Sequence, residues 1–329
     1  MGSTIGRAPA KTNENSPREP MHRSSRFRLP LIILALSSAI GTTPAASTTA
    51  PPSVAGTLAA PPNDEASGLA ASRRNTGLLW THDDSGGQPE LYAVETGGRL
   101  RGVLRLEGVK AEDWEDLAAA DFDGKAWLIV ADTGDNNAKR AHTWIHIVAE
   151  PGAERLSPAA PVSERPAASL KITYPDGPRD CESLAVDARE RAIYLLSKRD
   201  PVPRLYRLEI PNPLRDATIT ARFLGEVGRL PQPTAAQKLV RGYLGEHRAW
   251  PTAMDFSADG SSAVVLTYGH VMLFPRKNGE TWAAALAREP VLLPPHNLTQ
   301  AEATCFSADG RAIFVASEKT RNLLRYDLR

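Results

Sequence analysis

The stretches "TAMDFSADG" (residues 252–260) and "EATCFSADG" (302–310) share the run FSADG in the same frame. Each is a short series of small and apolar residues that ends in a polar turn. Three earlier stretches have the same form, namely "EASGLAAS" from Glu65, "EDLAAADFDG" from Glu115 and "ESLAVDARE" from Glu182. Self-similarity at a period of tens of residues indicates a repeat architecture.

A second strand follows each of these stretches. The five are "LLWTHDDSGG" (78–87), "WLIVADTGDNN" (127–137), "IYLLSKRD" (193–200), "AVVLTYGH" (263–270) and "IFVASEKT" (313–320). A third strand follows in every unit, and a fourth in the first four units. The lead positions are spaced 50, 67, 70 and 50 residues apart. Units of four antiparallel strands at this period are typical of the blades of a β-propeller.

The sequence therefore predicts an all-β protein with a five-bladed propeller. A six-bladed ring is the alternative if a long insertion hides a blade. The two long spacings hold the insertions "AERLSPAAPVSERPA" (153–167) and "PQPTAAQKLVRGYLGEHRA" (231–249). The fifth unit lacks a fourth strand, and we expect "SVAGTLA" (53–59) to supply it. Pairing of the front of the domain with the last blade would leave no open sheet edge.

The first fifty residues differ from the rest of the chain in composition. Basic residues at Arg23, Arg26 and Arg28 precede an apolar run (29–40) and then small residues up to Ala46. This order predicts a secretory signal over 1–46, with the true start at Met21 as an alternative. A membrane anchor is the other interpretation, but a dozen apolar residues fall short of the roughly 20 needed to span a bilayer. We expect a linker over 47–52, a single propeller domain over 53–329, and a secreted or periplasmic protein.

Composition narrows the function. The chain has 39 Lys and Arg against 38 Asp and Glu, a balance that argues against nucleic-acid binding. Nothing supports stable membrane insertion after removal of the signal, and we expect a monomer. The two cysteines, Cys181 and Cys305, are either free and packed or bonded after export; we favour the free thiols.

Carboxylates gather where the predicted first strands begin. In a propeller this strand lines the central channel, and the next strand returns to the same face, so side chains of different blades converge on one channel mouth. Acidic side chains crowded at a mouth can bind a hard cation such as Ca²⁺, which takes six to eight oxygen ligands. The candidate metal ligands are Glu65, Asp113, Glu115, Asp132, Asp135, Asp180, Glu182 and Glu302.

Other side chains at this mouth are candidates for binding a small anionic ligand or peptide: Arg179, Lys198, Arg199, Tyr268 and Lys319. The candidates for catalysis are His82, Asp83 and Lys198. Structural roles remain open for all of them. Acids at strand starts can accept backbone N–H groups, and "HDDSGG" and "DTGDNN" also have the composition of ordinary turns.

Several motifs together resemble a family of exported bacterial propellers described as phytase-like or esterase-like. They are "EASGLAASRRNTGLLWTHDDSGG", "DWEDLA", "VADTGDNNAKR", "YPDGPRDCESLAVD", "LTYG" and "AEATCFSADGRAIFVASE", and they extend from Glu65 to Glu318. The resemblance implies a propeller, export and a metal-dependent ester or phosphoester hydrolase. The chain departs from the family's pattern at Asp83, Cys181 and Thr252.

The sequence is consistent with two main functions. The first is a binding propeller, with Ca²⁺ in the mouth and basic side chains beside it for a small anion or peptide. The second is a hydrolase in which the metal activates water. The chain contains no nucleophile elbow, P-loop or HExxH motif, so binding is the preferred hypothesis and a purely structural role is the third.

Overall fold

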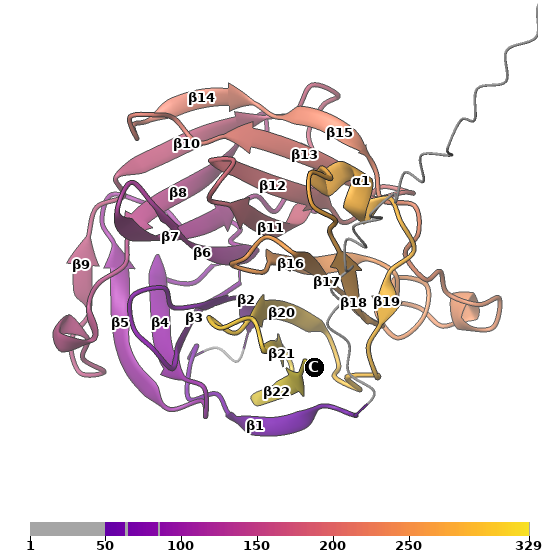
Figure 1. Ribbon diagram of the computed structural model, residues 1–329, viewed down its shortest axis with the longest axis horizontal. Helices are drawn as coiled ribbons and strands as arrows, with labels where there is room; N and C mark the ends of the chain where they lie inside the picture. The colour runs from indigo at the N-terminus through magenta and orange to yellow at the C-terminus, as the bar shows by residue number, and fades with distance from the viewer. Residues whose placement is uncertain (1–49, 63–64, 85, 329) are drawn as a thin grey trace, which may run out of the picture. The chain divides into compact units, whose positions relative to one another are not determined.

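The computed structural model describes residues 50–62, 65–84 and 86–328, and the predicted signal segment lies outside them. All strands belong to one compact unit, Pro44–Arg329. Within this unit, five antiparallel sheets are arranged around a common axis (Figure 1). The prediction of a five-bladed β-propeller is confirmed, and the six-bladed alternative is wrong.

Each blade begins with the strand nearest the axis. Blade one consists of β2 (Ala66–Ala71), β3 (Leu78–Asp83), β4 (Glu90–Glu95) and β5 (Leu100–Leu106). Blade two consists of β6 (Asp116–Phe122), β7 (Lys125–Asp132), β8 (Thr143–Ala149) and β10 (Ala168–Thr173). Blade three consists of β11 (Cys181–Asp187), β12 (Ala192–Ser197), β13 (Arg204–Glu209) and β15 (Arg222–Glu226). Blade four consists of β16 (Pro251–Phe256), β17 (Ser262–Thr267), β18 (Val271–Pro275) and β19 (Val291–Leu292). Blade five consists of β20 (Ala301–Phe306), β21 (Ala312–Ser317) and β22 (Asn322–Asp327), together with β1 (Ser53–Thr57) from the front of the domain.

Hydrophobic side chains pack between neighbouring blades rather than in a single centre. Each of the five apolar clusters joins side chains from two adjacent blades. Between blades three and four, for example, Phe256 stacks on Trp282 of α1 (Trp282–Leu286) at 3.7 Å, and Tyr194 contacts the same phenyl ring edge-on. No blade can bury both of its faces alone, so the stability of each depends on its neighbours.

The inner strands are rich in alanine, serine and glycine because five of them crowd around the axis. Each inner strand lies beside the inner strands of the two adjacent blades. Among them, Asp116 is fully buried and links three blades. Its carboxylate accepts backbone N–H groups from Leu117 at 2.8 Å, Leu184 of β11 at 2.7 Å and Met254 of β16 at 3.2 Å.

Two strands were not predicted. β9 (Val162–Glu164), from the insertion after β8, pairs in parallel with β5 and gives blade one a fifth strand. β14 (Ala217–Thr220) pairs in parallel with β10 and extends blade two in the same way. Both cover the outer edge of a blade that would otherwise be open. The second insertion contains only the short η2 (Gln237–Leu239), and η1 (Ala153–Arg155) precedes β9.

The cysteines are free and buried, as expected. Cys181 lies in β11 and Cys305 in β20, and burial raises the pKa of both thiols. Among the described residues, none of the helices has the length and apolar character needed to cross a lipid bilayer.

The ring is closed by the front of the domain, as predicted. β1 pairs antiparallel with β22, and Val54 lies opposite Leu324 (Figure 1). The backbone N–H of Leu58 then donates to the carbonyl of Arg321 at 2.7 Å, and the Arg321 guanidinium donates back to the carbonyl of Leu58 at 3.1 Å. First and last blades are thereby joined by hydrogen bonds between opposite ends of the chain.

Gly56 allows this closing strand to approach blade one. A Cβ at Gly56 would lie 2.0 Å from the carbonyl oxygen of Gly97, whereas a Cβ at Gly97 would meet nothing within 4 Å. We therefore expect Gly56→Ala to lower the free energy of unfolding by about 1–3 kcal/mol, because the backbone of Gly97 cannot move aside without disturbing the β1–β22 closure.

Gly97→Ala is the matched control and is expected to stay close to the native stability. Urea denaturation followed by circular dichroism measures both. Equal midpoints for Gly56→Ala, Gly97→Ala and the native chain would show that the tight approach of β1 does not contribute to stability.

Candidate functional site

The starts of the inner strands and the ends of the second strands meet at one face, as the antiparallel pairing requires. The backbone N–H of Glu115 bonds the carbonyl of Ala131 at 2.9 Å, and the N–H of Lys198 bonds the carbonyl of Asp180 at 2.9 Å. Side chains just before β6 and β11 therefore lie beside those that end β7 and β12. This face is called the acidic mouth below.

The register corrects one part of the predicted repeat. At the position just before the regular pairing begins, the five blades carry Ser67, Glu115, Glu182, Thr252 and Glu302. The expectation of four glutamates is wrong in blade one, where Ser67 and not Glu65 occupies this position. The hydroxyls of Ser67 and Thr252 donate to backbone carbonyls of the next blade at 2.9 and 2.8 Å. At this position, three blades thus carry a glutamate, and the other two carry a hydroxyl side chain that forms a hydrogen bond to the next blade.

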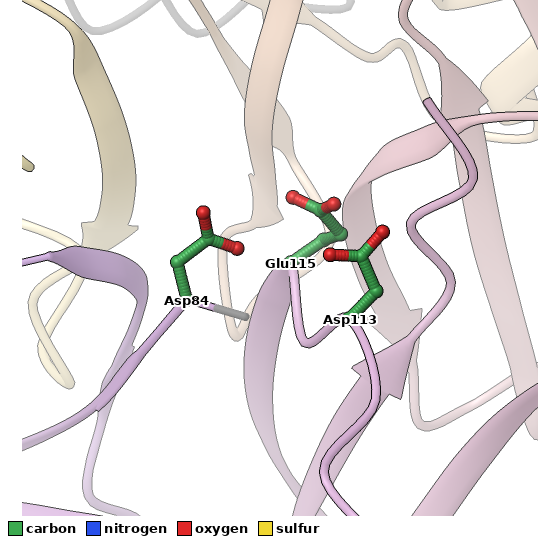
Figure 2. A group of neighbouring side chains, drawn as sticks. All are labelled: Asp84, Asp113 and Glu115. Carbon is green, nitrogen blue, oxygen red and sulfur yellow. The ribbon is translucent and has the colours of Figure 1, made fainter. Parts of the chain in front are cut away.

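Five carboxylates approach one another in two groups that share Glu115. The first group is Asp84, Asp113 and Glu115, and the second is Glu115, Asp180 and Glu182. Within each group, one oxygen of every side chain lies within 4.8 Å of the others. Figure 2 shows the carboxylates of the first group around a common space, Asp84 from the loop after β3 and the other two from the segment that leads into β6.

Glu115 is 4% exposed, and within the described part of the chain its carboxylate has no hydrogen bond or ion pair. Gly134 provides the room for it. A Cβ on Gly134 would lie 2.1 Å from Oε1 of Glu115 and 2.4 Å from Oδ2 of Asp113. The turn after β7 therefore needs glycine at 134 to accommodate the two carboxylates.

The protonation of this first group reflects burial and mutual repulsion. Burial, and then the charges of Asp84 and Asp180, raise the pKa of Asp113 to about 6. Burial also raises the pKa of Glu115 well above its usual range, and the charges of Glu182 and Asp84 add to the shift. Ionised carboxylates at this spacing favour either a proton or a bound cation.

Cations from the protein pair with two members of the second group, Glu182 and Asp180. Lys198, which is 3% exposed, forms an ion pair with Glu182 and lies 3.7 Å from Glu302. Burial alone would lower the pKa of this lysine, but the charges of Glu182 and Glu302 raise it well above its usual value. Arg199 pairs with Asp180 at 2.5 Å and stacks over the ring of Trp250, with a third (33%) of its side chain exposed.

Blade five adds a carboxyl pair to this network. Glu302 accepts a hydrogen bond from the Tyr268 hydroxyl at 2.5 Å, and Lys198 Nζ lies 5.0 Å from the centre of the Tyr268 ring. Burial and the hydrogen bond to Glu302 raise the pKa of Glu318 to about 10. Burial opposes the ionisation of Glu302, but the charge of Lys198 and the bond from Glu318 hold its pKa below the usual range. Of the two carboxyls, Glu318 is therefore the one that more readily holds a proton.

Asp132 and Asp135 shape the loop after β7. Asp132 pairs with Arg140 at 2.8 Å and accepts the backbone N–H groups of Glu112 and Asp113. Asp135 accepts the N–H groups of Lys139 and Arg140, both at 2.8 Å. These two carboxylates make the contacts expected of turn residues, and they belong to neither acidic group, as is also true of Glu65 and Glu302.

Two candidate ligand-binding residues, Arg179 and Lys319, form no ion pair with the five carboxylates of the two acidic groups among the residues that the structure describes. Arg179 pairs with Asp176 at 3.2 Å and Asp200 at 3.4 Å, and its Nε donates to the hydroxyl of Tyr206. Lys319, with 46% of its side chain exposed, lies 3.7 Å from Glu318. Of the predicted cations, Arg199 and Lys319 are the ones that combine exposure with proximity to the mouth carboxyls.

His82 and Asp83 end β3 in a buried position. His82 Nδ1 donates to the carbonyl of Asp83 at 2.7 Å, and its ring meets Trp114 edge-on at 5.6 Å. Burial lowers the pKa of His82 to about 4, so the imidazole is neutral at pH 7. Gly68 makes room for it, since a Cβ there would lie 2.4 Å from His82 Nε2. The histidine packs inside blade one, out of reach of a solvent-borne substrate.

Two residues of the site, Asp84 and Gly134, were not among the predicted candidates. Asp84 follows Asp83 directly in the sequence. Strand alternation could have distinguished their roles, because Asp83 is the last residue of β3 and Asp84 lies beyond the end of the strand. Gly134 sits in "DTGDNN", where a glycine is ordinary for a turn, so nothing in the sequence reveals its spatial role. The opposite pKa shifts of Glu318 and Glu302 depend on the contact between two strands, which the sequence does not reveal.

Comparisons with known proteins identify no family for the chain. No protein-family model matches the chain, and no curated protein matches it. Its structure is similar to that of the PQQ-bound aldose sugar dehydrogenase of Streptomyces coelicolor, with a TM-score of 0.46, 12% identity, and coverage of 85% of this chain and 98% of that one. It is also similar to a gluconolactonase of Xanthomonas campestris, with a TM-score of 0.44, 13% identity, and coverage of 80% and 72%. The chain is thus a five-bladed β-propeller with clustered carboxylates at one channel mouth.

The ion pairs at Lys198 make a clear prediction. Lys198→Met keeps the shape but leaves Glu182 and Glu302 without their cation, so the free energy of unfolding should fall by about 3–5 kcal/mol. Adding Glu182→Gln removes one of the two carboxylates and should recover part of that loss. Denaturation of both single variants and the double variant measures the coupling; strictly additive effects would contradict the pairing.

Proposed function

We propose that this chain is an exported binding propeller whose acidic mouth holds a hard divalent cation, Ca²⁺ by preference, between Asp84, Asp113 and Glu115. The cation would in turn bind a small anionic ligand or an acidic peptide at the same face. The proposal concerns the first acidic group, because Lys198 and Arg199 already pair with Glu182 and Asp180 of the second.

The spacing of the carboxylates supports this choice. Oxygens on opposite sides of a Ca²⁺ ion are at most about 4.8 Å apart, which is twice a typical Ca–O distance. One oxygen from each member of the group falls within that limit. The donors are all carboxylate oxygens, as suits Ca²⁺ rather than a softer metal.

The observation that carries the proposal is the buried carboxylate of Glu115, which forms no hydrogen bond or ion pair with the residues that the structure describes. A buried charge is costly unless it is paired or coordinates a metal. Gly134 leaves room for Glu115 and Asp113 to point into the same space instead of toward a protein cation. Neighbouring carboxylates raise the pKa of Glu115, and the charge of Lys198 opposes them without forming an ion pair with Glu115 among the described residues, so a bound cation would supply the partner.

The anionic ligand would approach from solvent beside Arg199 and Lys319. Asp84 and Asp113 are only partly buried, which leaves a bound cation accessible to a further oxygen ligand. The exposed third of Arg199 could pair with a phosphate or carboxylate group. A monomer suffices for this site, because the three cation ligands come from two blades of one chain.

The proposal includes export through the basic, apolar and small residues that precede Ala46. The mature protein is then expected to begin at about residues 44–50, after signal cleavage. Mass spectrometry of the protein recovered from the medium or periplasm measures this end. A folded product that still begins at Met1 or Met21 would contradict export by cleavage.

Cation binding is expected to stabilise the fold. A ligand that binds only the folded state adds RT ln(1 + [L]/Kd), which is about 2.7 kcal/mol at a hundredfold excess over Kd. Chelator should therefore lower the melting temperature by several degrees, and Ca²⁺ should restore it. Glu115→Gln keeps the shape of the side chain but should abolish most of the restoration, because it removes the buried charge.

Two further variants sharpen this test. Gly134→Ala pushes a methyl group into the carboxylates and should weaken Ca²⁺ binding without removing any charge. Asp121→Asn removes a carboxylate at the opposite end of the inner strand β6 and should leave the Ca²⁺ response unchanged. A melting curve insensitive to chelator, in protein that contains no metal by elemental analysis, would overturn the proposal.

A metal-dependent ester or phosphoester hydrolase is the second candidate, and the solvent access of Asp84 and Asp113 favours it. Turnover of phosphate and carboxylate esters with and without Ca²⁺ separates the two functions. Ca²⁺-dependent turnover that Glu115→Gln abolishes would assign a hydrolase, and Ca²⁺ binding without turnover would leave the binding function.

A further inference from the structure

A cavity of about 240 Å³ lies at the end of the channel opposite to the acidic mouth. Its walls come from the last residues of three inner strands, among them Asp121 in β6, Val186 in β11 and Phe256 in β16. Arg73, which follows the end of β2, lines it as well. The inner strands are about 20 Å long, so this cavity is separate from the carboxylates at their starts.

Two guanidinium groups line the cavity. The Nε atom of Arg73 donates to the carbonyl of Ala119 at 2.9 Å, which orients the group. Its two terminal nitrogens have no hydrogen bond or ion pair among the described residues. The side chain of Arg189 is exposed and likewise makes neither kind of contact within the described chain. An oriented guanidinium with free terminal N–H groups suits bidentate binding of an oxyanion.

The acidic side chains of the cavity do not cancel this charge. Asp187 is satisfied by Arg276 at 3.0 Å and by Nε1 of Trp282 at 2.8 Å. Asp121 is the remaining carboxylate in the lining, and it has no ion pair among the described residues. Among the described residues, the cavity therefore presents two guanidinium groups and one carboxylate that form no ion pair. The charge of Arg73 also opposes the burial-driven rise in the pKa of Asp121 and of the buried Asp255.

The rest of the lining is apolar and compact, with Ala119, Ala120, Val186 and Phe256. A 150 Å³ apolar cavity holds benzene, whereas sites for drug-sized ligands begin at about 300 Å³. The volume thus fits a molecule little larger than a single aromatic ring. Because Trp282 is covered by Phe256 on one side and Arg276 lies over its ring, its faces are not available for stacking.

We propose that this second cavity binds a small oxyanion, a carboxylate or phosphate group on a compact apolar body, through Arg73 and Arg189. The site is independent of the cation at the acidic mouth. Asp121 repels the negative charge of the ligand. Removing this carboxylate should therefore raise the affinity for the ligand, and removing a guanidinium group should lower it.

The test uses benzoate, phenyl phosphate and the neutral analogue benzamide as probes. All titrations are made by calorimetry in the presence of chelator, so that no divalent cation at the acidic mouth contributes. Saturable 1:1 binding of benzoate or phenyl phosphate, with benzamide much weaker, is expected. The relative affinities of the two anions distinguish a carboxylate site from a phosphate site.

Charge variants locate the binding. Arg189→Gln should weaken anion binding roughly 2- to 5-fold, and Asp121→Asn should tighten it by a similar factor. Both residues are exposed, so the variants are expected to fold. Arg222→Gln removes an exposed arginine from the outer strand β15, far from the lining, and is the matched control.

Three results would overturn the proposal: no saturable binding of either anion by the native chain, equal affinity for benzoate and benzamide, or the same change in Arg189→Gln as in Arg222→Gln. Weaker binding in Asp121→Asn would also overturn it, because that would place a positive group of the ligand, rather than its anion, in the cavity.

Discussion

The carboxylate of Asp116 is the interaction on which the arrangement of the blades depends. One oxygen accepts the N–H of Leu117, and the other accepts N–H groups from Leu184 and Met254 in blades three and four. Asp255 repeats the pattern by accepting the N–H of Phe306 in blade five. Inner strands around the axis cannot all satisfy their N–H groups within their own sheets, so buried carboxylates take the place of missing strand partners.

The acidic mouth is a consequence of the same geometry. Every blade delivers its strand start and its second-strand end to one face, so polar side chains from different blades must accumulate there. The protein neutralises part of that charge with Lys198 and Arg199, and opposite pKa shifts of Glu302 and Glu318 reduce it further. Among the described residues, the carboxylates of Glu115 and Asp113 form no ion pair, and the proposed cation depends on these two carboxylates rather than on the total number of acids.

Among the described residues, the charged side chains that form no ion pair are mainly acidic at one end of the channel and mainly basic at the other. Carboxylates remain at the starts of the inner strands, and guanidinium groups remain at the opposite end. The alanine-rich inner strands between them are closely packed, and Asp116 is buried there with all its hydrogen bonds made inside the protein. The packed strands therefore separate the proposed cation site from the proposed anion site.

The sequence by itself determined the blade number, the order of strands, the closing strand and the face on which the acids gather, because period-two alternation and repeat spacing are local properties of the chain. It could not determine which acids face each other. Glu65 and Ser67 are two residues apart in the sequence, and only the strand register assigns Ser67 to the position of Glu115. Burial of Lys198, the room left by Gly134 and the parallel edge strands β9 and β14 likewise depend on contacts between blades. Charge compensation is decided by distances of a few ångströms between residues far apart in the chain, and those distances exist only in the folded ring.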